Sequence, residues 1–149
     1  MKSVIIYAST HHGNTKKVVD AIAGECEVEL VDATKEHEKD LSEYDLIGFA
    51  SGIFYSKFSE QVLKMARECL PEGKDVFFIA TAGNPAKNYF SSITSITEEK
   101  KCREAGRFIC KGYDTFGPFK LVGGIQKGHP DETELSEAVD FYKGICGDR

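Results

Sequence analysis

Short apolar runs alternate with helical patterns along this chain of 149 residues. The runs consist almost entirely of apolar residues, and the stretches between them carry apolar residues at helical spacing, such as Val18, Val19 and Ile22. Apolar strands that alternate with helices are typical of a parallel sheet covered on both faces. We therefore predict an α/β fold of the (βα)5 type. The expected strands are 3–8, 27–31, 46–50, 76–80 and 108–111, and the expected helices are 14–24, 59–70, 92–106 and 130–145.

The length and the order of these elements predict one doubly wound domain spanning residues 1–149. The chain is near the commonest size for a single domain. Right-handed crossovers and strand order 2-1-3-4-5 give a five-stranded parallel sheet in a three-layer α/β/α arrangement. In such a sheet the loops after strands one, three and four, which are residues 9–15, 51–58 and 81–90, lie on one rim, where ligands gather.

The loop at residues 9–15, with the sequence S-T-H-H-G-N-T, has the composition of a phosphate-binding turn. It joins a strand to a helix, whose first N–H groups lack partners within the helix and carry partial positive charge. The spacing matches neither the G-x-x-x-x-G-K-[ST] of nucleoside-triphosphate sites nor the G-x-G-x-x-G of dinucleotide sites. What remains, T-x-x-G-N-T, suits a terminal phosphomonoester. The alternative is a helix cap rich in Ser and Thr that binds no ligand.

This loop resembles that of the flavodoxin family, whose first loop reads [ST]-x-[ST]-G-N-T and wraps the phosphate of FMN. His11 and His12 take the place of one small polar residue of that pattern. The resemblance in layout extends over nearly the whole chain, so it implies a flavodoxin-like fold with FMN as the cofactor. It also implies that backbone N–H groups of the loop and the hydroxyls of Thr10 and Thr15 hold the phosphate.

The second and third loops carry aromatic residues that suit a flavin ring. Phe54 and Tyr55 follow a small turn in the second loop, and Tyr89 lies in the third. Stacking a planar flavin on Phe or Tyr buries apolar surface with favourable ring geometry; the alternative is that each aromatic ring packs under the next helix. Backbone N–H groups of the third loop are expected to face the carbonyl-rich pyrimidine edge. The complete set of residues expected to bind the cofactor is Ser9, Thr10, His11, His12, Gly13, Asn14, Thr15, Ser51, Gly52, Ile53, Phe54, Tyr55, Thr81, Ala82, Gly83, Asn84 and Tyr89.

The second loop departs from the flavodoxin pattern, which has an aromatic residue followed by Gly-Asp. In flavodoxins that glycine lets a peptide flip, so that its carbonyl accepts the N5 hydrogen of the neutral semiquinone. Ile53, Phe54 and Tyr55 stand here instead. Because a positive φ is costly without glycine, we expect a less favoured one-electron state. The stretch A-S-G-I-F-Y-S-K-F is also similar to the flavodoxin-domain group that includes menaquinone-dependent protoporphyrinogen oxidase.

Strand ends, charge and hydropathy argue against several other classes of protein. A receiver domain of the same fold needs carboxylates at the ends of strands one and three, where this chain has Ala8-Ser9 and Ala50-Ser51. The formal charge of −5, from 19 basic and 24 acidic residues, argues against a nucleic-acid partner. Apolar stretches fall short of the roughly 20 residues of a membrane span, so we expect no membrane span.

The cysteines and histidines predict neither a disulfide nor a metal site. The five cysteines are widely spread without a C-x-x-C pair, which favours reduced thiols and a cytoplasmic protein. Cys110 lies within an expected strand and is therefore expected in the core. We interpret His11, His12 and His129, near the expected rim, as solvated surface residues, because nothing nearby in sequence completes a triad or a metal set.

Three functions from different classes remain open. The first is an FMN electron carrier that passes single electrons between redox partner proteins, with an acidic surface that steers it toward basic docking sites. The second is an FMN-dependent oxidoreductase acting on a quinone or similar small acceptor, and the third is a flavin-free binding module. In the first two the flavin carries the redox chemistry, and no catalytic acid or base is required. The long segment 112–129 is expected to flank the flavin, form a partner surface or cover the sheet edge.

Overall fold

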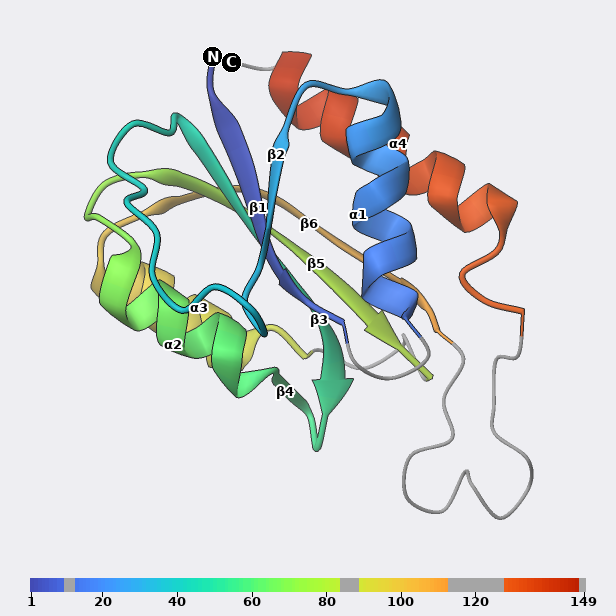
Figure 1. Ribbon diagram of the computed structural model, residues 1–149, viewed down its shortest axis with the longest axis horizontal. Helices are drawn as coiled ribbons and strands as arrows, with labels where there is room; N and C mark the ends of the chain where they lie inside the picture. The colour runs from blue at the N-terminus through green and yellow to red at the C-terminus, as the bar shows by residue number, and fades with distance from the viewer. Residues whose placement is uncertain (10–12, 84–88, 113–127, 148–149) are drawn as a thin grey trace.

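A six-stranded sheet forms the centre of the computed structural model, which describes residues 1–9, 13–83, 89–112 and 128–147 (Figure 1). Five strands are parallel in the order β2-β1-β3-β5-β6, and the short β4 pairs antiparallel with β3. This confirms the predicted strand order, with β4 as an addition. The strands are β1 (Ser3–Ala8), β2 (Glu29–Asp32), β3 (Leu46–Phe54), β4 (Lys57–Phe58), β5 (Asp75–Ala82) and β6 (Arg103–Lys111), and the helices are α1 (Asn14–Glu25), α2 (Glu60–Cys69), α3 (Ser91–Glu99) and α4 (Glu132–Gly147).

Helices cover both faces of the sheet, which confirms the predicted three-layer α/β/α arrangement. Helices α1 and α4 lie on one face, and α2 and α3 lie on the other (Figure 1). Successive side chains of a strand point to opposite faces, so Val4 and Ile6 of β1 join the core under α2 and α3, while Ile5 joins the core under α1 and α4. Each such fully buried aliphatic side chain stabilises the fold by about 1.5–3 kcal/mol relative to an exposed one. Two apolar cores therefore hold the rim of the sheet in place.

The prediction of a helix at 92–106 is wrong beyond Glu99, where α3 ends. The chain turns at Lys101, whose φ is 59°, and enters β6 at Arg103. Arg103 forms two hydrogen bonds with Asp75 at the start of β5, at 3.1 and 3.0 Å. Because β6 is an edge strand, its charged residues lie at the surface, and edge strands commonly carry such charges. The same charges imitate the polar face of a helix in the sequence.

The remaining elements match the predicted ones, with shifted ends. The second strand is 29–32 instead of 27–31, β5 extends to Ala82, and β6 begins five residues earlier than residue 108. The fourth helix begins at Glu132 rather than at residue 130. Within the described part of the chain, no helix is long and apolar enough to cross a membrane.

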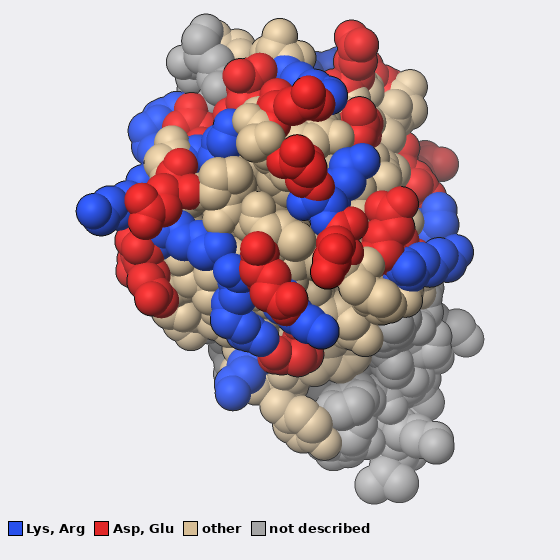
Figure 2. Space-filling view, turned by 60° about the vertical axis from the view of Figure 1, so that its left-hand side comes forward, with Lys and Arg blue, Asp and Glu red and all other residues tan. Residues whose placement is uncertain are grey.

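Figure 2 shows that basic and acidic side chains are interspersed on the face that lies to the left in Figure 1. Basic and acidic side chains of the protein form several exposed ion pairs, including Lys2 with Glu43 at 3.1 Å. Exposed pairs of this kind are worth about 0–1 kcal/mol each. The mixture of signs therefore contributes little to stability and leaves this face without a uniform charge.

Candidate functional site

The carboxyl ends of β1, β3 and β5 meet the beginning of α1 at one edge of the sheet (Figure 1). Ala8 at the end of β1 is paired with Ser51 of β3, and Gly52 of β3 is paired with Thr81 of β5. Parallel strands with helical crossovers place such loops at a common edge, where ligands bind in doubly wound folds. The three loops predicted to converge therefore do begin side by side.

The first loop (residues 9–15) passes into α1 through a left-handed glycine. Gly13 has φ 66° and ψ 21° and precedes the helix, a conformation that favours glycine. Its carbonyl accepts the N–H of Lys17 at 3.1 Å, and Ser9 Oγ accepts the N–H of Lys16 at 3.0 Å. Thr10, His11 and His12 lie outside the described residues. The described part of this loop thus delivers the first N–H groups of α1 to the rim.

Two buried threonines from different elements meet beneath this loop. Thr15 Oγ1 of α1 and Thr81 Oγ1 of β5 are 3.1 Å apart and hydrogen-bonded, and the two residues are 1% and 3% exposed. Gly52 of β3 lies against both, because a Cβ placed there would be 3.8 Å from Thr15 Oγ1 and 3.7 Å from Thr81 Oγ1. One predicted residue from each of the three loops therefore lies at this point of the rim.

The beginning of α1, like that of α3, has no carboxylate in its first turn, whereas the first turns of α2 and α4 contain glutamates. Lys16 and Lys17 occupy that turn instead. Lys16 Nζ lies 2.6 Å from Asp20 Oδ2, and this hydrogen bond raises the pKa of Lys16. The partial positive charge at the start of α1 is thus not offset within its own first turn, which suits an external anion.

Residues 51–54 were predicted as a loop, and the structure corrects this. They continue β3, and a two-residue turn at Tyr55 and Ser56 leads into β4. Both turn residues have positive φ, 49° and 68°, as in the hairpin turns that Asn-Gly usually occupies. Because neither residue is glycine or asparagine, the sequence carried no signal for this turn. The β3–β4 hairpin is the observed form of the second loop.

The tip of this hairpin presents an aromatic ring to solvent. Tyr55 is 83% exposed, while Phe54 beside it is half-buried. A cavity of about 500 Å³ lies next to the tip, bounded by both rings, by β4 and by the first residues of α2. An exposed tyrosine at the rim is available for stacking on a planar ligand.

Other predicted site residues have structural contacts of their own. Ser51 is fully buried; its Oγ donates to the carbonyl of Gly52 at 2.5 Å and accepts the N–H of Ser59 at 2.8 Å, so it fastens the hairpin to α2. Ile53 is half-buried and packs on the core under α2 and α3. Tyr89 is only 8% exposed. The ring of Tyr55 is therefore far more accessible than that of Tyr89.

The remaining predicted residues lie at or near the same edge. Asn14 is buried at the start of α1, Ala82 ends β5, and Gly83 follows it. Asn84 lies outside the described residues, as does most of the long segment 112–129. The expectation that this segment flanks a ligand thus stays a prediction.

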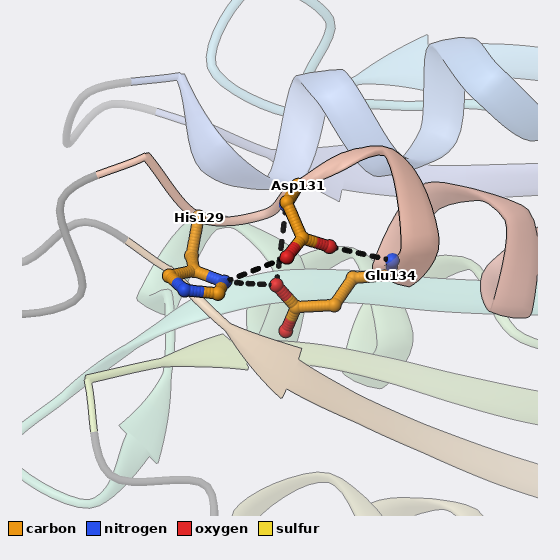
Figure 3. A group of neighbouring side chains, drawn as sticks. All are labelled: His129, Asp131 and Glu134. Atoms are coloured by element: carbon orange, nitrogen blue, oxygen red, sulfur yellow. Dashed lines mark hydrogen bonds and ion pairs between the residues drawn. The ribbon is translucent and has the colours of Figure 1, made fainter.

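The interpretation of His129 as a solvated surface residue, with nothing nearby in sequence to complete a metal set, is wrong. Its side chain is 26% exposed, Nδ1 contacts Glu134 Oε1, and Nδ1 lies 3.6 Å from Asp131 Oδ2 (Figure 3). The spacing D-x-x-E at the start of a helix is a readable capping signal, but the contact with His129 has no local signature. Cys110, by contrast, is 5% exposed, which confirms its predicted place in the core.

Gly112, which follows β6, was not among the predicted site residues. Its N–H donates to the carbonyl of Ala82 at 3.0 Å, so it extends the pairing of β6 with β5. A Cβ at this position would lie 2.6 Å from Asn14 Nδ2, which is closer than a real Cβ can approach. Gly112 therefore lets the end of β6 lie directly against the start of α1.

Comparison with known proteins agrees with this architecture. An uncharacterized protein of Methanocaldococcus jannaschii is 37% identical over 147 residues, covering 97% of this chain and 98% of its own length. The structure of oxidised flavodoxin 2 from Bacillus cereus superposes with a TM-score of 0.62 at 20% identity and covers 100% of both chains. Rubredoxin oxygen:oxidoreductase from Desulfovibrio gigas gives a TM-score of 0.71 at 15% identity, with 99% of this chain matching 35% of that one.

The family assignment follows from the sequence match together with the fold. Residues 4–116, which are more than half of the chain, match the family described as flavodoxin domain. The matched stretch includes β1 to β6 and thus the three strand ends and the start of α1 that form the rim. The chain belongs to the flavodoxin-domain family.

Proposed function

We propose that this protein binds FMN at the carboxyl edge of its sheet and passes electrons between redox partners. The observation that carries the proposal is the meeting of Thr15, Gly52 and Thr81 at the start of a helix without an acidic first turn. We call this group the phosphate end of the site. The flavodoxin-domain family of this chain and its structural similarity to a flavodoxin and to a rubredoxin oxygen:oxidoreductase support a redox role.

The phosphate end has the chemistry that a dianionic phosphomonoester needs. Backbone N–H groups at the start of α1 supply donors with partial positive charge. One of the two hydroxyls of Thr15 and Thr81 donates the hydrogen bond between them, and the hydroxyl that accepts it keeps its own proton to donate to another acceptor. Ser9 holds the N–H of Lys16 at 3.0 Å and thereby fixes the path of the chain into the helix.

The hairpin supplies the contact for the ring system. Tyr55 extends from its tip with 83% of its surface exposed, and ladder pairs Ile53 with Phe58 and Phe54 with Lys57 hold the two strands beneath it. Bound FMN would supply the redox chemistry, while these residues orient it and shield part of it from water. The formal charge of −5 favours encounter with basic docking surfaces on partner proteins.

Reconstitution tests this function directly. Purified protein is titrated with FMN and with riboflavin, and binding is followed by quenching of flavin fluorescence. We expect FMN to bind at least about 100-fold more tightly than riboflavin, since several charge-assisted hydrogen bonds depend on the phosphate. Equal affinities would refute the phosphate end, and no binding of either flavin would refute the proposed function.

One observation favours a second candidate, an oxidoreductase acting on a quinone or similar small acceptor. The hairpin turn holds Tyr55 and Ser56 at positive φ between paired strands, so its backbone has little freedom to rearrange when the flavin changes oxidation state. A redox titration separates the two candidates. Two resolved one-electron steps support the carrier, whereas a single two-electron step together with quinone turnover supports the oxidoreductase.

A further inference from the structure

A single carboxylate at the start of α4 contacts two separate segments of the chain, the end of β6 and residues 129–131. Figure 3 shows Glu134 facing His129 and Asp131. Glu134 Oε1 accepts the N–H of Asp131 at 3.1 Å, and Asp131 Oδ1 accepts the N–H of Glu134 at 2.9 Å. This reciprocal pair is a capping box, which satisfies N–H groups at the start of the helix.

The second oxygen of Glu134 accepts a hydrogen bond that is not part of a capping box. Oε2 accepts the N–H of Lys111 at 2.8 Å, and Lys111 is the last residue of β6, 23 residues away in sequence. The side chain of Glu134 is only 14% exposed, and its Oε1 also contacts Nδ1 of His129. Glu134 thereby ties the end of β6 to the start of α4.

Gly112 connects the end of β6 to the residues around the phosphate end. This residue follows Lys111, donates its N–H to Ala82 at 3.0 Å, and lies so close to Asn14 that a Cβ would be 2.6 Å from Nδ2. Ala82 in turn follows Thr81, which is hydrogen-bonded to Thr15 at 3.1 Å. Two routes therefore connect the Glu134 carboxylate to the start of α1, and both pass through Lys111 and Gly112: one reaches Asn14 directly, and the other reaches Thr15 by way of Ala82 and Thr81.

We propose that Glu134 is a positioning residue, whose carboxylate fixes the end of β6 so that Gly112 holds Asn14 in place at the phosphate end. The proposal rests on the proposed function, because the affinity for FMN is one of its readouts. The negative charge of Glu134 is close to β6: burial raises the pKa of Cys110 to about 12, and the carboxylates of Glu134, Glu137 and Asp131 add to that effect.

His129, Asp131 and Glu134 have donor atoms within 4.8 Å of one another, which is close enough for a metal ion. The simultaneous hydrogen bonding of Glu134 to Lys111 and Asp131, which we call the clamp, accounts better for the contacts of these side chains. Both oxygens of Glu134 and one oxygen of Asp131 already accept backbone N–H groups at 2.8–3.1 Å. A cation would also face the partial positive charge at the start of α4.

Three substitutions separate a clamp from a simple helix cap. Glu134→Gln keeps the size of the side chain and one oxygen, so it cannot accept from Lys111 and Asp131 as the carboxylate does. Asp131→Ala removes the cap but not the contact with β6. Glu132→Gln is the matched control, because it removes the same charge from an exposed position in the same first turn.

Two measurements are made on all three variants. Amide hydrogen exchange of Lys111, Gly112 and Asn14 is followed by NMR in the protein without FMN, and the FMN dissociation constant is measured by fluorescence. For Glu134→Gln we expect exchange at Lys111 to be about tenfold faster, altered exchange at Asn14, and FMN binding about tenfold weaker. Asp131→Ala and Glu132→Gln should bind FMN within about twofold of the unmodified protein.

Glu134→Gln that binds FMN as the unmodified protein does, or that leaves Asn14 unchanged, would overturn the proposal. So would equal losses of affinity in Glu134→Gln and Asp131→Ala, since these indicate only a helix cap. Stabilisation of the protein by Zn²⁺ or Mn²⁺ that disappears in Glu134→Gln would also overturn it, in favour of a metal site. If the protein binds no FMN at all, the proposed function fails. Amide exchange at Asn14 then tests by itself whether Glu134 positions this residue.

Discussion

The beginnings of α1 and α4 lie at the same edge of the sheet, yet their N–H groups are satisfied in opposite ways. At α4, Asp131 and Glu134 form a reciprocal capping box and His129 packs against both carboxylates. At α1, the residue before the helix is Gly13, the neutral hydroxyl of Ser9 accepts the N–H of Lys16, and the first turn has no acidic residue. The difference shows that two helices of one layer can have opposite electrostatic roles.

That difference assigns the two helix starts to different tasks. A helix start closed by its own carboxylates attracts no further anion, because its partial positive charge is already compensated. The start of α1 retains that charge and has buried hydroxyls beneath it, from Thr15 and Thr81. We therefore expect an anion to stabilise α1 and to have no effect on α4.

The largest expected effect comes from giving α1 a carboxylate like those of α4. Thr15→Asp should abolish FMN retention, because the new charge faces the phosphate. Thr15→Asn is its control: both variants lose the hydroxyl bonded to Thr81, but Asn is neutral. We expect FMN to bind Thr15→Asp at least about 100-fold more weakly than Thr15→Asn. Equal flavin content in the two purified variants would contradict the assignment of the phosphate end.

A substitution in the hairpin measures how much affinity comes from outside the helix start. Tyr55→Ala should weaken FMN binding by about 1–3 kcal/mol, as for other rings stacked on aromatic side chains. Tyr55→Phe retains a flat ring and should bind nearly as well as tyrosine. Tyr89→Ala, at a buried position, should chiefly lower the free energy of unfolding, by about 3 kcal/mol. A larger loss of FMN affinity in Tyr89→Ala than in Tyr55→Ala would reverse this assignment.

Loss of each helix cap should affect stability differently with and without FMN. Asp131→Ala should lower the free energy of unfolding by about 1 kcal/mol whether or not FMN is bound. Ser9→Ala, which removes the acceptor for the N–H of Lys16, should cost about 0.5–1 kcal/mol in the free protein and less once FMN is bound. Urea unfolding of both variants checks this, and identical FMN dependence in the two would remove the contrast between the helices.

The last effect appears only at high pH and concerns the buried thiol of Cys110, which lies near the carboxylates of α4. Burial, followed by Glu134, Glu137 and Asp131, raises the pKa of Cys110 from 9.0 to about 12 in the folded protein. The unfolded chain then loses the thiol proton first, so the stability from this group is fully present below pH 9 and decreases as pH rises toward 12. Unfolding free energies between these limits should fall more steeply for the unmodified protein than for Cys110→Ala. Equal slopes in the two proteins would contradict the raised pKa of Cys110.

The succession of strands and helices along the chain, and the loop at the start of α1, followed from local patterns. Apolar runs such as 3–8 and 46–50 have no polar face, so they predict strands covered on both sides, and S-T-H-H-G-N-T marks the start of α1. These signals are short-range, and neighbouring residues suffice to read them. The charged edge strand β6 was misread for the same reason, because its exposed Arg and Glu residues match the polar face of a helix.

What the sequence by itself determined about this protein is the doubly wound fold and the strand-to-helix loop at its rim, since both arise from the order of neighbouring residues. Only the tertiary structure decided that Ser51 is buried, that Tyr55 is presented on a hairpin, and that Glu134 reaches Lys111. These features depend on contacts between residues distant in sequence. The packing of sheet and helices creates such contacts, and no local pattern encodes them.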